Sequence, residues 1–413
     1  MSTLQIKALH PIYCSGRAVS HTCLSVCEHL RNRHIRIGLL VPASDPAARR
    51  VFTRDALAPW LRRIALRLMG ESDRLQHFTE RKFLRWLTPE DVAYLWPGVS
   101  LAVYERVKAG GGTLIVERIN CHRATSRRIL DEAYARLGWR PTHGIRDADV
   151  ELERRKLALA DLVFAPSPTV RASLEQAGVP GARILSVSYG WDPRRFAGRD
   201  RSLPPADGLT VLFVGYLCVR KGAHLLLSAW AQARVPGRLV LAGRVAPDIA
   251  ANCADQLNRP DVVHIAHTDA IGAVYRSADV FAFPTLEEGS PLVSYEALAC
   301  GIPLLISPMG AGEIVRDGRE GLVRDPYEQA AWVAALQRLA RDRDLRAALA
   351  VGAAARAGAY TWPHAGARRR RVLLAALRAT PPSAAPVTPG AAPAAADSGR
   401  TARIAQPAQA HVR

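Results

Sequence analysis

The chain has 413 residues, of which 49% are hydrophobic and 23% are charged, a composition that excludes a fully disordered chain, a collagen and a small disulfide scaffold. The length predicts two domains. The formal net charge of +19 is compatible with nucleic acid, an anionic membrane surface or phosphorylated substrates as partners.

Apolar runs alternate with amphipathic stretches in the first half, which predicts an α/β fold. The first half is expected to hold strands over residues 4–9, 36–41, 93–96, 113–118, 162–165 and 184–187. A turn that contains Gly16 follows the first strand. Helices are expected over residues 21–31, 100–108, 150–159 and 169–176.

A second α/β series follows a polar segment with two prolines, 199–207, which is expected to be a linker. Its strands are expected over 209–214, 238–242, 262–265, 280–283 and 303–307, with helices beginning near Ala223, Ala270, Leu292 and Gln329. Two such series predict two doubly wound, Rossmann-like domains that face each other across a cleft. Ligands bind beyond the carboxyl ends of the strands in such sheets.

These observations predict the boundaries of the domains. An N-terminal domain is expected over 1–198, a linker over 199–208 and a C-terminal domain over 209–361. A final helix is expected over 362–379. From residue 380 onward the chain is mostly Ala, Pro, Ser, Thr and Gly, which predicts a disordered tail over 380–413.

Targeting signals and cysteine usage point to the cytoplasm. No run approaches 18 apolar residues, and the first 18 residues lack the pattern of a signal peptide. The seven cysteines are scattered without a CxxC pair, which favours free thiols in a reducing compartment.

The segment 285–303 carries the most informative motif. It follows an apolar strand, and Gly289 permits close approach of a ligand to the backbone. The residues Ser290, Pro291, Leu292 and Val293 lead into a helix whose free N–H groups can bind an anion. Glu288 precedes this helix and Glu296 lies one turn inside it. Carboxylates only accept hydrogen bonds at neutral pH, so the pair suits the hydroxyl groups of a sugar and a ribose.

A second motif spans residues 211–222. A strand leads into a turn at Gly215, then two cations, Arg220 and Lys221, then a helix. Lys221 is informative because only five of the 56 basic residues are lysines. The two cations, opposite a helix N-terminus, are expected to stabilise a diphosphate leaving group.

These two motifs together resemble the GT-B nucleotide-sugar glycosyltransferases, specifically the large retaining family GT4. The family's Glu-x7-Glu signature matches Glu288 and Glu296, and its Gly-x-Leu…Lys-Gly segment matches residues 215–222. The segments 189–192, 299–303 and 312–323 also resemble the family. One departure stands at Tyr216, where the family commonly has arginine, and Arg220 is the residue that could supply the missing guanidinium.

The resemblance implies a role for each motif residue. Glu288 would bind the donor sugar, Glu296 the ribose, and Arg220 with Lys221 the diphosphate. His122 matches the family histidine that contacts the donor sugar, with a structural loop histidine as the alternative. Gly16 resembles the glycine loop near donor and acceptor, with an ordinary turn as the alternative.

The implied activity is transfer of a sugar from a nucleotide-diphosphate sugar to an acceptor hydroxyl, with retention at the anomeric carbon. The acceptor would be a glycan, a lipid-linked saccharide or another small molecule bound by the N-terminal domain. The final helix would cross back to that domain. A sugar-nucleotide epimerase on the same fold and a non-catalytic nucleotide-sugar-binding protein remain alternatives.

No cofactor or protein-bound metal is expected. Asp147-Ala148-Asp149 resembles a metal-binding DxD, but it precedes a helical run, which favours N-capping. The segment 49–86 holds ten basic residues against four acidic ones, with Trp60, Phe78, Phe83 and Trp86 between them. It suits either a peripheral position on the inner face of an anionic membrane or a solvated helix with inward aromatics. The arginine-rich segment 338–378 carries no nucleic-acid motif.

Overall fold

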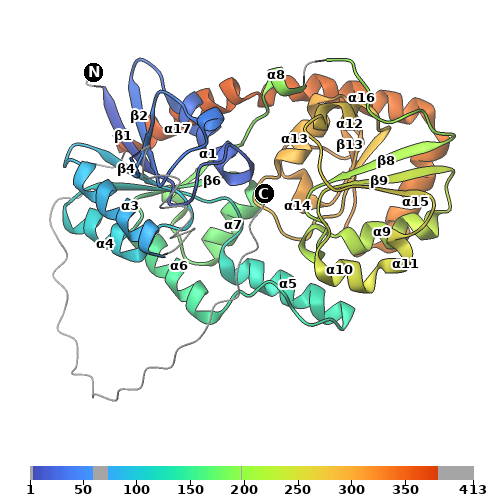
Figure 1. Cartoon of the computed structure of the whole chain (residues 1–413), viewed down its shortest axis with the longest axis horizontal. Coiled ribbons are helices and arrows are strands. Elements are labelled where there is room, and N and C mark those ends of the chain that lie inside the picture. The colour runs from blue at the N-terminus through green and yellow to red at the C-terminus, as the bar shows by residue number, and fades with distance from the viewer. Residues whose placement is uncertain (1–2, 59–72, 197, 380–413) are drawn as a thin grey trace.

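The computed structural model describes residues 3–58, 73–196 and 198–379. In these ranges the chain forms two lobes, each built on one sheet (Figure 1). Every strand pair in both sheets is parallel. The predicted architecture of two Rossmann-like α/β domains is therefore confirmed. The predicted tail, 380–413, lies outside the described residues.

The N-terminal sheet has seven strands in the order β3-β2-β1-β4-β5-β6-β7. Their bounds are β1 (Leu4–Leu9), β2 (Ile35–Val41), β3 (Thr53–Asp55), β4 (Val92–Leu95), β5 (Thr113–Glu117), β6 (Leu162–Ala165) and β7 (Ile184–Ser186). The strands β4 and β6 are buried at every position, because helices cover both faces of the sheet.

The helices of this lobe connect successive strands. They are α1 (Ala18–Leu30), α3 (Asp73–Trp86), α4 (Leu101–Ala109), α5 (Arg123–Leu137), α6 (Asp147–Leu159) and α7 (Pro168–Gln176). The short helix α8 (Pro193–Phe196) follows the last strand and leads to the other lobe. The elements β3, α5 and α8 were not predicted. The edge strand β3 has only three residues, of which two are charged. The helix α5 is rich in charged residues, although its buried residues Ser126, Leu130, Ala133 and Tyr134 have helical spacing.

The C-terminal sheet has six strands in the order β10-β9-β8-β11-β12-β13. Their bounds are β8 (Leu209–Val214), β9 (Gly237–Ala242), β10 (Val262–Ile265), β11 (Val280–Phe283), β12 (Leu304–Ile306) and β13 (Gly321–Val323). All were predicted to within a residue except the short edge strand β13, which was not predicted.

Four helices of this lobe begin at or within a residue of the predicted positions: α9 (Ala223–Ala233), α12 (Ile271–Arg276), α13 (Leu292–Ala299) and α15 (Gln329–Arg341). Four further helices were not predicted: α10 (Pro247–Asn252), α11 (Ala254–Leu257), α14 (Pro308–Ala311) and α16 (Arg343–Ala357). A 3-10 turn, Val219–Lys221, separates β8 from α9.

The last helix, α17 (Trp362–Ala379), leaves the C-terminal lobe and packs on α1 of the N-terminal lobe (Figure 1). Gly366 permits this close approach, because a Cβ there would lie 2.2 Å from the carbonyl oxygen of His29. Arg369 donates two hydrogen bonds of 2.9 Å to Glu117 at the end of β5. One arginine of the basic run 368–371 is therefore buried in an ion pair that joins α17 to the N-terminal sheet.

Candidate active site

Two loops of the C-terminal domain meet at the carboxyl edge of its sheet. One follows β8 over residues 215–222, and the other follows β11 over residues 284–291. The two strands are parallel neighbours, so their carboxyl ends lie side by side. Gly222 has a φ of +69°, and a Cβ there would lie 2.0 Å from the carbonyl oxygen of Pro284. The loops touch because this position is glycine.

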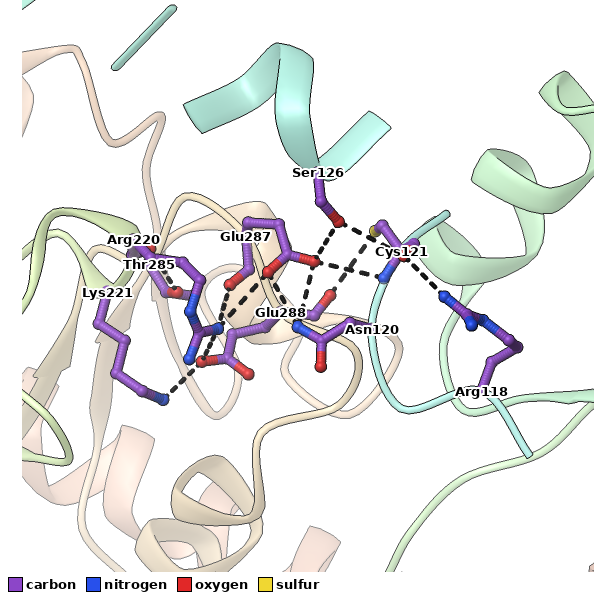
Figure 2. A network of polar contacts seen from close by, with 9 residues as sticks. All are labelled: Arg118, Asn120, Cys121, Ser126, Arg220, Lys221, Thr285, Glu287 and Glu288. Atoms are coloured by element: carbon purple, nitrogen blue, oxygen red, sulfur yellow. Dashed lines mark hydrogen bonds and ion pairs between the residues drawn. The ribbon is translucent and has the colours of Figure 1, made fainter. Parts of the chain in front are cut away.

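Glu288 holds two cations at this edge. Its Oε1 accepts hydrogen bonds from Arg220 Nη1 at 2.9 Å and from Lys221 Nζ at 2.5 Å (Figure 2). Burial acts to raise the pKa of Glu288, but Lys221 and Arg220 outweigh burial and hold this pKa below its ordinary value. The carboxylate is therefore ionised at neutral pH. The structure brings together three of the four residues predicted as catalytic.

The family commonly has an arginine at a position where this chain has tyrosine. Arg220 provides a guanidinium from a different position of the same loop. Tyr216 stands at that usual position, 43% exposed, with the Arg244 guanidinium 5.8 Å from its ring centre. Arg220 also donates to the carbonyl oxygen of Glu287 at 2.8 Å. A guanidinium is thus present at the cleft despite the tyrosine.

Glu287 is a site residue that the sequence analysis missed. Its carboxylate is 2% exposed and accepts hydrogen bonds from the other domain. Asn120 Nδ2 donates to both oxygens at 2.9 and 3.1 Å, and Ser126 Oγ donates at 2.9 Å. The backbone N–H of Cys121 adds a bond of 3.3 Å. Figure 2 shows the carboxylate between Arg220 on its own domain and these donors on the N-terminal domain.

Gly289 lies where the two domains touch. A Cβ on this glycine would lie 1.8 Å from the carbonyl oxygen of Ile119, which follows β5. Neighbouring residues of the two loops extend the contact, since Cys121 Sγ lies 3.7 Å from the carbonyl oxygen of Glu288. Gly289 is therefore needed because the backbone of the N-terminal domain approaches it closely. The sequence analysis had instead expected this glycine to allow the close approach of a ligand.

Glu296 lies on α13, apart from the Glu288 cluster. Its carboxylate accepts a hydrogen bond of 3.0 Å from the hydroxyl of Tyr275. Burial raises the pKa of Glu296, although Arg195 and Tyr275 partly oppose that effect. In the part of the chain that the structure describes, no ion pair neutralises this carboxylate.

The start of α13 has the form that the sequence predicted. The helix begins at Leu292, followed by Val293, and Pro291 as N-cap supplies no side-chain hydrogen bond. Ser290 instead bonds the hydroxyl of Tyr295 at 2.6 Å. N–H groups of the first turn are thus left without a side-chain cap, the arrangement that suits an anion.

His122 does not join the Glu288 cluster. It is the N-cap residue of α5, and its Nδ1 accepts a hydrogen bond of 3.2 Å from the N–H of Ala124. Its Nε2 is buried 3.4 Å from Glu153. Burial lowers the pKa of His122, so the ring is neutral at neutral pH. These contacts favour the structural alternative for this histidine.

Gly16 lies in the loop between β1 and α1 with a φ of +71°, as a turn glycine would. The next residue, Arg17, reaches across to Asp269 of the C-terminal domain at 3.9 Å, and both side chains are exposed. The loop therefore faces the other domain, but Gly16 itself makes no contact with the Glu288 cluster.

A pocket of about 400 Å³ opens beside Arg220 and Glu287. Both domains contribute to its wall: Tyr216 and Cys218 from one, and Arg118, Asn120, Arg123, Tyr134, Thr142 and His143 among those from the other. Its volume lies within the range typical of small-molecule sites. Arg118 is paired with Glu153 at 2.5 Å, whereas Arg123 is exposed.

The acidic pair at the start of α6 serves the helix. Asp149 accepts a hydrogen bond of 3.0 Å from the backbone N–H of Arg146, and Asp147 pairs with Arg127. Asp149, the third residue of the helix, thus completes a capping box with Arg146. In the three described ranges, no group of three or more His, Cys, Asp or Glu side chains is arranged to hold a metal ion.

Part of the chain is similar to a known family of proteins. Residues 208–342 match the family model described as "Glycosyl transferases group 1". A D-inositol 3-phosphate glycosyltransferase of Thermobispora bispora is 30% identical over 249 residues, 54% of this chain and 58% of that protein. Its namesake in Actinosynnema mirum is 35% identical over 205 residues, 44% of this chain and 49% of that protein. The chain thus spans about half the length of the curated relatives it matches.

Solved structures share the fold over almost the whole chain. Sucrose-phosphate synthase of Thermosynechococcus elongatus superposes with a TM-score of 0.69 at 20% identity, covering 91% of this chain and 100% of that one. HepE of Anabaena, in complex with UDP-glucose, gives a TM-score of 0.65 at 17% identity, covering 90% and 100%. The two domains together therefore have the GT-B arrangement.

Proposed function

We propose that this chain, a GT-B protein whose residues 208–342 belong to the glycosyl transferases group 1, transfers a sugar from a nucleotide-diphosphate sugar to an acceptor hydroxyl with retention of configuration. The observation that carries the proposal is the pair of cations, Arg220 and Lys221, held on Glu288 at the carboxyl edge of the C-terminal sheet. Ligands of doubly wound folds bind at that edge.

The cluster explains departure of the leaving group. As the bond between the anomeric carbon and the diphosphate breaks, negative charge grows on the diphosphate oxygen. Arg220 and Lys221 are already in place to stabilise that charge, with the uncapped start of α13 nearby. The acceptor oxygen bonds the anomeric carbon from the same face, and the hydroxyl proton passes to the departing diphosphate.

The two motif glutamates would hold the parts of the donor that carry hydroxyl groups. A diphosphate would compete with Glu288 for Lys221 and Arg220, which frees the Glu288 oxygens to accept hydrogen bonds from the sugar. Glu296, without a cationic partner in the described chain, can accept from the two ribose hydroxyls. Glu288 would thus act on the reacting sugar and Glu296 on the unreactive ribose.

The acceptor would bind in the pocket beside Arg220. Its wall is formed mostly by the N-terminal domain and offers both donors and acceptors of hydrogen bonds, among them Asn120, Thr142 and His143. A polar molecule of the size of one sugar ring fits the volume of about 400 Å³. The pocket meets the donor site at Arg220, which places an acceptor hydroxyl next to the diphosphate.

We further propose that the reaction needs no metal held by the protein. The diphosphate charge would be met by Arg220 and Lys221, and the DxD-like acids are occupied by Arg127 and the start of α6. Activity that persists in EDTA and is not restored or increased by added Mg²⁺ or Mn²⁺ is the expected result.

The protein would act at an anionic membrane surface. None of the helices in the described ranges is long and apolar enough to cross a membrane. The helix α3 exposes Arg74, Arg81, Lys82 and Arg85, whereas Phe83 is fully buried and Phe78 and Trp86 pack on the core. Its attraction to the surface would therefore be electrostatic, without aromatic insertion. Residues 59–72, which include Trp60, lie outside the described ranges.

The test is turnover of a panel of nucleotide sugars, beginning with UDP-glucose, against saccharide and inositol phosphate acceptors. The expected products are a free nucleoside diphosphate and an α-linked glycoside from an α-linked donor. An epimerised nucleotide sugar as the product would support the epimerase alternative. Binding of donors without turnover or hydrolysis in any combination would support the binding-protein alternative.

A further inference from the structure

A second hollow lies in the C-terminal domain, away from the cleft. It has a volume of about 510 Å³ and lies between the segment 198–201, α12, the end of α13 and α16. Five of the residues that line it are arginines: Arg199, Arg201, Arg276, Arg343 and Arg346. Asp279 is the one carboxylate among the lining residues. We refer to this feature as the arginine hollow.

The arginine hollow lies at the opposite edge of the sheet from the catalytic cluster. Asp279 immediately precedes β11, and Pro303 immediately precedes β12, so the hollow is at the amino ends of these strands. Arg220 and Lys221 follow the carboxyl end of β8. A donor bound in the cleft therefore cannot occupy the hollow.

Two of the five arginines have roles in the fold. Arg276 donates to the carbonyl oxygens of Asp200 at 2.9 Å and Phe196 at 3.3 Å. Arg346 donates to the carbonyl oxygens of Leu339 and Ala340 at the end of α15. These bonds hold both guanidinium groups at the wall of the arginine hollow. Their acceptors are uncharged carbonyl oxygens, so the bonds do not pair either positive charge with a carboxylate.

The other three arginines have no such role. Arg199, Arg201 and Arg343 are exposed, and their side chains make no hydrogen bond or ion pair with any described residue. Two neighbouring acids face other partners: Asp342 accepts from the N–H of Leu345 at 2.9 Å, and Asp279 accepts from the N–H of Thr210 at 2.8 Å. The three arginines therefore lie together without an ion pair to a described carboxylate.

We propose that the arginine hollow binds an anion that carries two or more clustered phosphate groups. Like charges gathered in one concave site repel each other, and a multivalent anion removes that repulsion. Guanidinium groups bind phosphate oxygens through paired N–H donors, and an anion with more than one phosphate can engage more of the arginines that line the hollow at once. The hollow is a binding site in its own right and does not rest on the proposed catalytic activity.

The anion would also contact the helix that carries Glu296. Cys300 and Gly301 line the hollow directly after the end of α13, whose other end begins beside the Glu288 loop. Occupancy of the hollow can therefore be read at α13 by hydrogen exchange as well as by direct binding.

The probe is inorganic pyrophosphate, measured by calorimetry at low ionic strength because salt screens exposed charges. The wild-type protein should bind two pyrophosphates, one in the cleft and one in the hollow. A triple variant, Arg199→Ser, Arg201→Ser and Arg343→Ser, should bind one, with the second site weakened at least tenfold. The three side chains hold no part of the fold, so the variant should fold normally.

A matched control removes the same charge elsewhere: Arg128→Ser, Arg183→Ser and Arg319→Ser, all exposed. It should still bind two pyrophosphates. Unchanged binding in the first triple variant, or an equal loss in the control, would overturn the proposal. Lys221→Ala should remove the cleft site alone, so a failure there counts against the cleft assignment and leaves the hollow standing.

A second arm identifies the source of the phosphates once pyrophosphate binding is lost in the triple variant. Vesicles that contain phosphatidylinositol bisphosphate are compared for the wild type and that variant. Loss of vesicle binding in the variant assigns the phosphates to a lipid headgroup, and unchanged vesicle binding assigns them to a free anion.

Discussion

The carboxylate of Glu287 and the amide of Asn120 join the two domains through a pair of hydrogen bonds, 2.9 and 3.1 Å long, directly beside the Glu288 cluster. Glu287 also lies 3.5 Å from Arg220. A change in the position of the N-terminal domain therefore alters the contacts of Glu287, the residue that precedes Glu288. The position of the N-terminal domain and the placement of Arg220 are thus physically linked.

This link predicts coupling between Glu287 and Asn120 in a double-mutant cycle. Asn120→Asp places two carboxylates together and should destabilise the closed arrangement. Adding Glu287→Gln restores a donor–acceptor pair, so the double variant should be more stable than the sum of the single changes predicts, by about 0.5–3 kcal/mol. Urea denaturation measures the free energy of unfolding of each variant. The donor KM reports whether the change at the domain contact affects donor binding.

Additive effects on unfolding and on KM would contradict that prediction. Arg154→Ala with Glu151→Ala provides a control cycle, because this exposed pair lies on α6, within the N-terminal domain. Its coupling energy should be below about 1 kcal/mol.

Lys221→Ala should lower kcat strongly while the fold persists. Loss of one preorganised donor that stabilises a developing negative charge costs roughly 10²–10³ in rate. Lys108→Ala is the matched control, since Lys108 also pairs with a carboxylate, Asp161, at 2.8 Å but outside the cleft. Steady-state kinetics on both variants, with circular dichroism to verify folding, make the comparison. Near-normal turnover in folded Lys221→Ala would exclude the proposed diphosphate role.

His122 should be replaceable by a residue that also caps a helix. His122→Ala removes the cap of α5 and should cost about 0.5–2 kcal/mol of stability. Asn is a favoured N-cap residue, so His122→Asn should recover most of that stability and keep kcat within a few fold. A hundredfold loss of kcat in a stable His122→Asn protein would instead support the sugar contact that the family resemblance implies.

The sequence was sufficient for the parts of the fold that repeat a strong local pattern. Buried strands such as β8 and β11 are continuous apolar runs, and α13 follows a glycine loop, so each was predicted close to its observed bounds. The edge strands β3 and β13 were missed because three residues carry too little pattern. The helix α5 was missed because its polar residues hide a buried stripe that recurs at helical spacing.

A site residue could be predicted only where it belongs to a recognisable local motif. Glu288, Arg220 and Lys221 come from two motifs on neighbouring strands, and the structure brings them together. Glu287 could not be distinguished from an exposed loop acid, because its partners Asn120 and Ser126 lie more than 160 residues away in the chain. His122 was placed by resemblance, whereas its surroundings depend on Glu153 of another helix.

The protein should bind anionic vesicles more tightly than neutral ones, and moderate salt should release it. Basic residues near an anionic surface contribute about 1 kcal/mol each, and salt screens that attraction. Vesicle sedimentation with Arg74→Ser, Arg81→Ser and Arg85→Ser tests α3 directly. The control triple variant of Arg128, Arg183 and Arg319 removes equal charge from other surfaces. Equal partitioning onto both vesicle types would contradict the proposal.

The two motif glutamates should produce different kinetic defects. Glu288 is proposed to touch the sugar, whose bonds change in the transition state, so Glu288→Gln should mainly lower kcat. Glu296 is proposed to hold the ribose, which does not react, so Glu296→Gln should mainly raise the donor KM. Uniform binding appears in KM, whereas interactions that strengthen in the transition state appear in kcat. The opposite pattern would reverse the two assignments.

The pH dependence of KM extends this prediction to Glu296. Burial raises the pKa of this carboxyl, so it takes up a proton at a higher pH than an ordinary glutamate does. The protonated form loses an acceptor for the ribose, and donor KM should therefore rise as the pH falls through the acidic range, before ordinary glutamates titrate. Glu296→Gln should have a raised KM that no longer changes with pH. Glu296 also makes the free energy of unfolding depend on pH. Because its pKa is higher in the folded than in the unfolded protein, the proton on Glu296 stabilises the fold at low pH, and this contribution is lost as the pH rises. A KM that varies with pH equally in wild type and Glu296→Gln would show that another group governs donor binding.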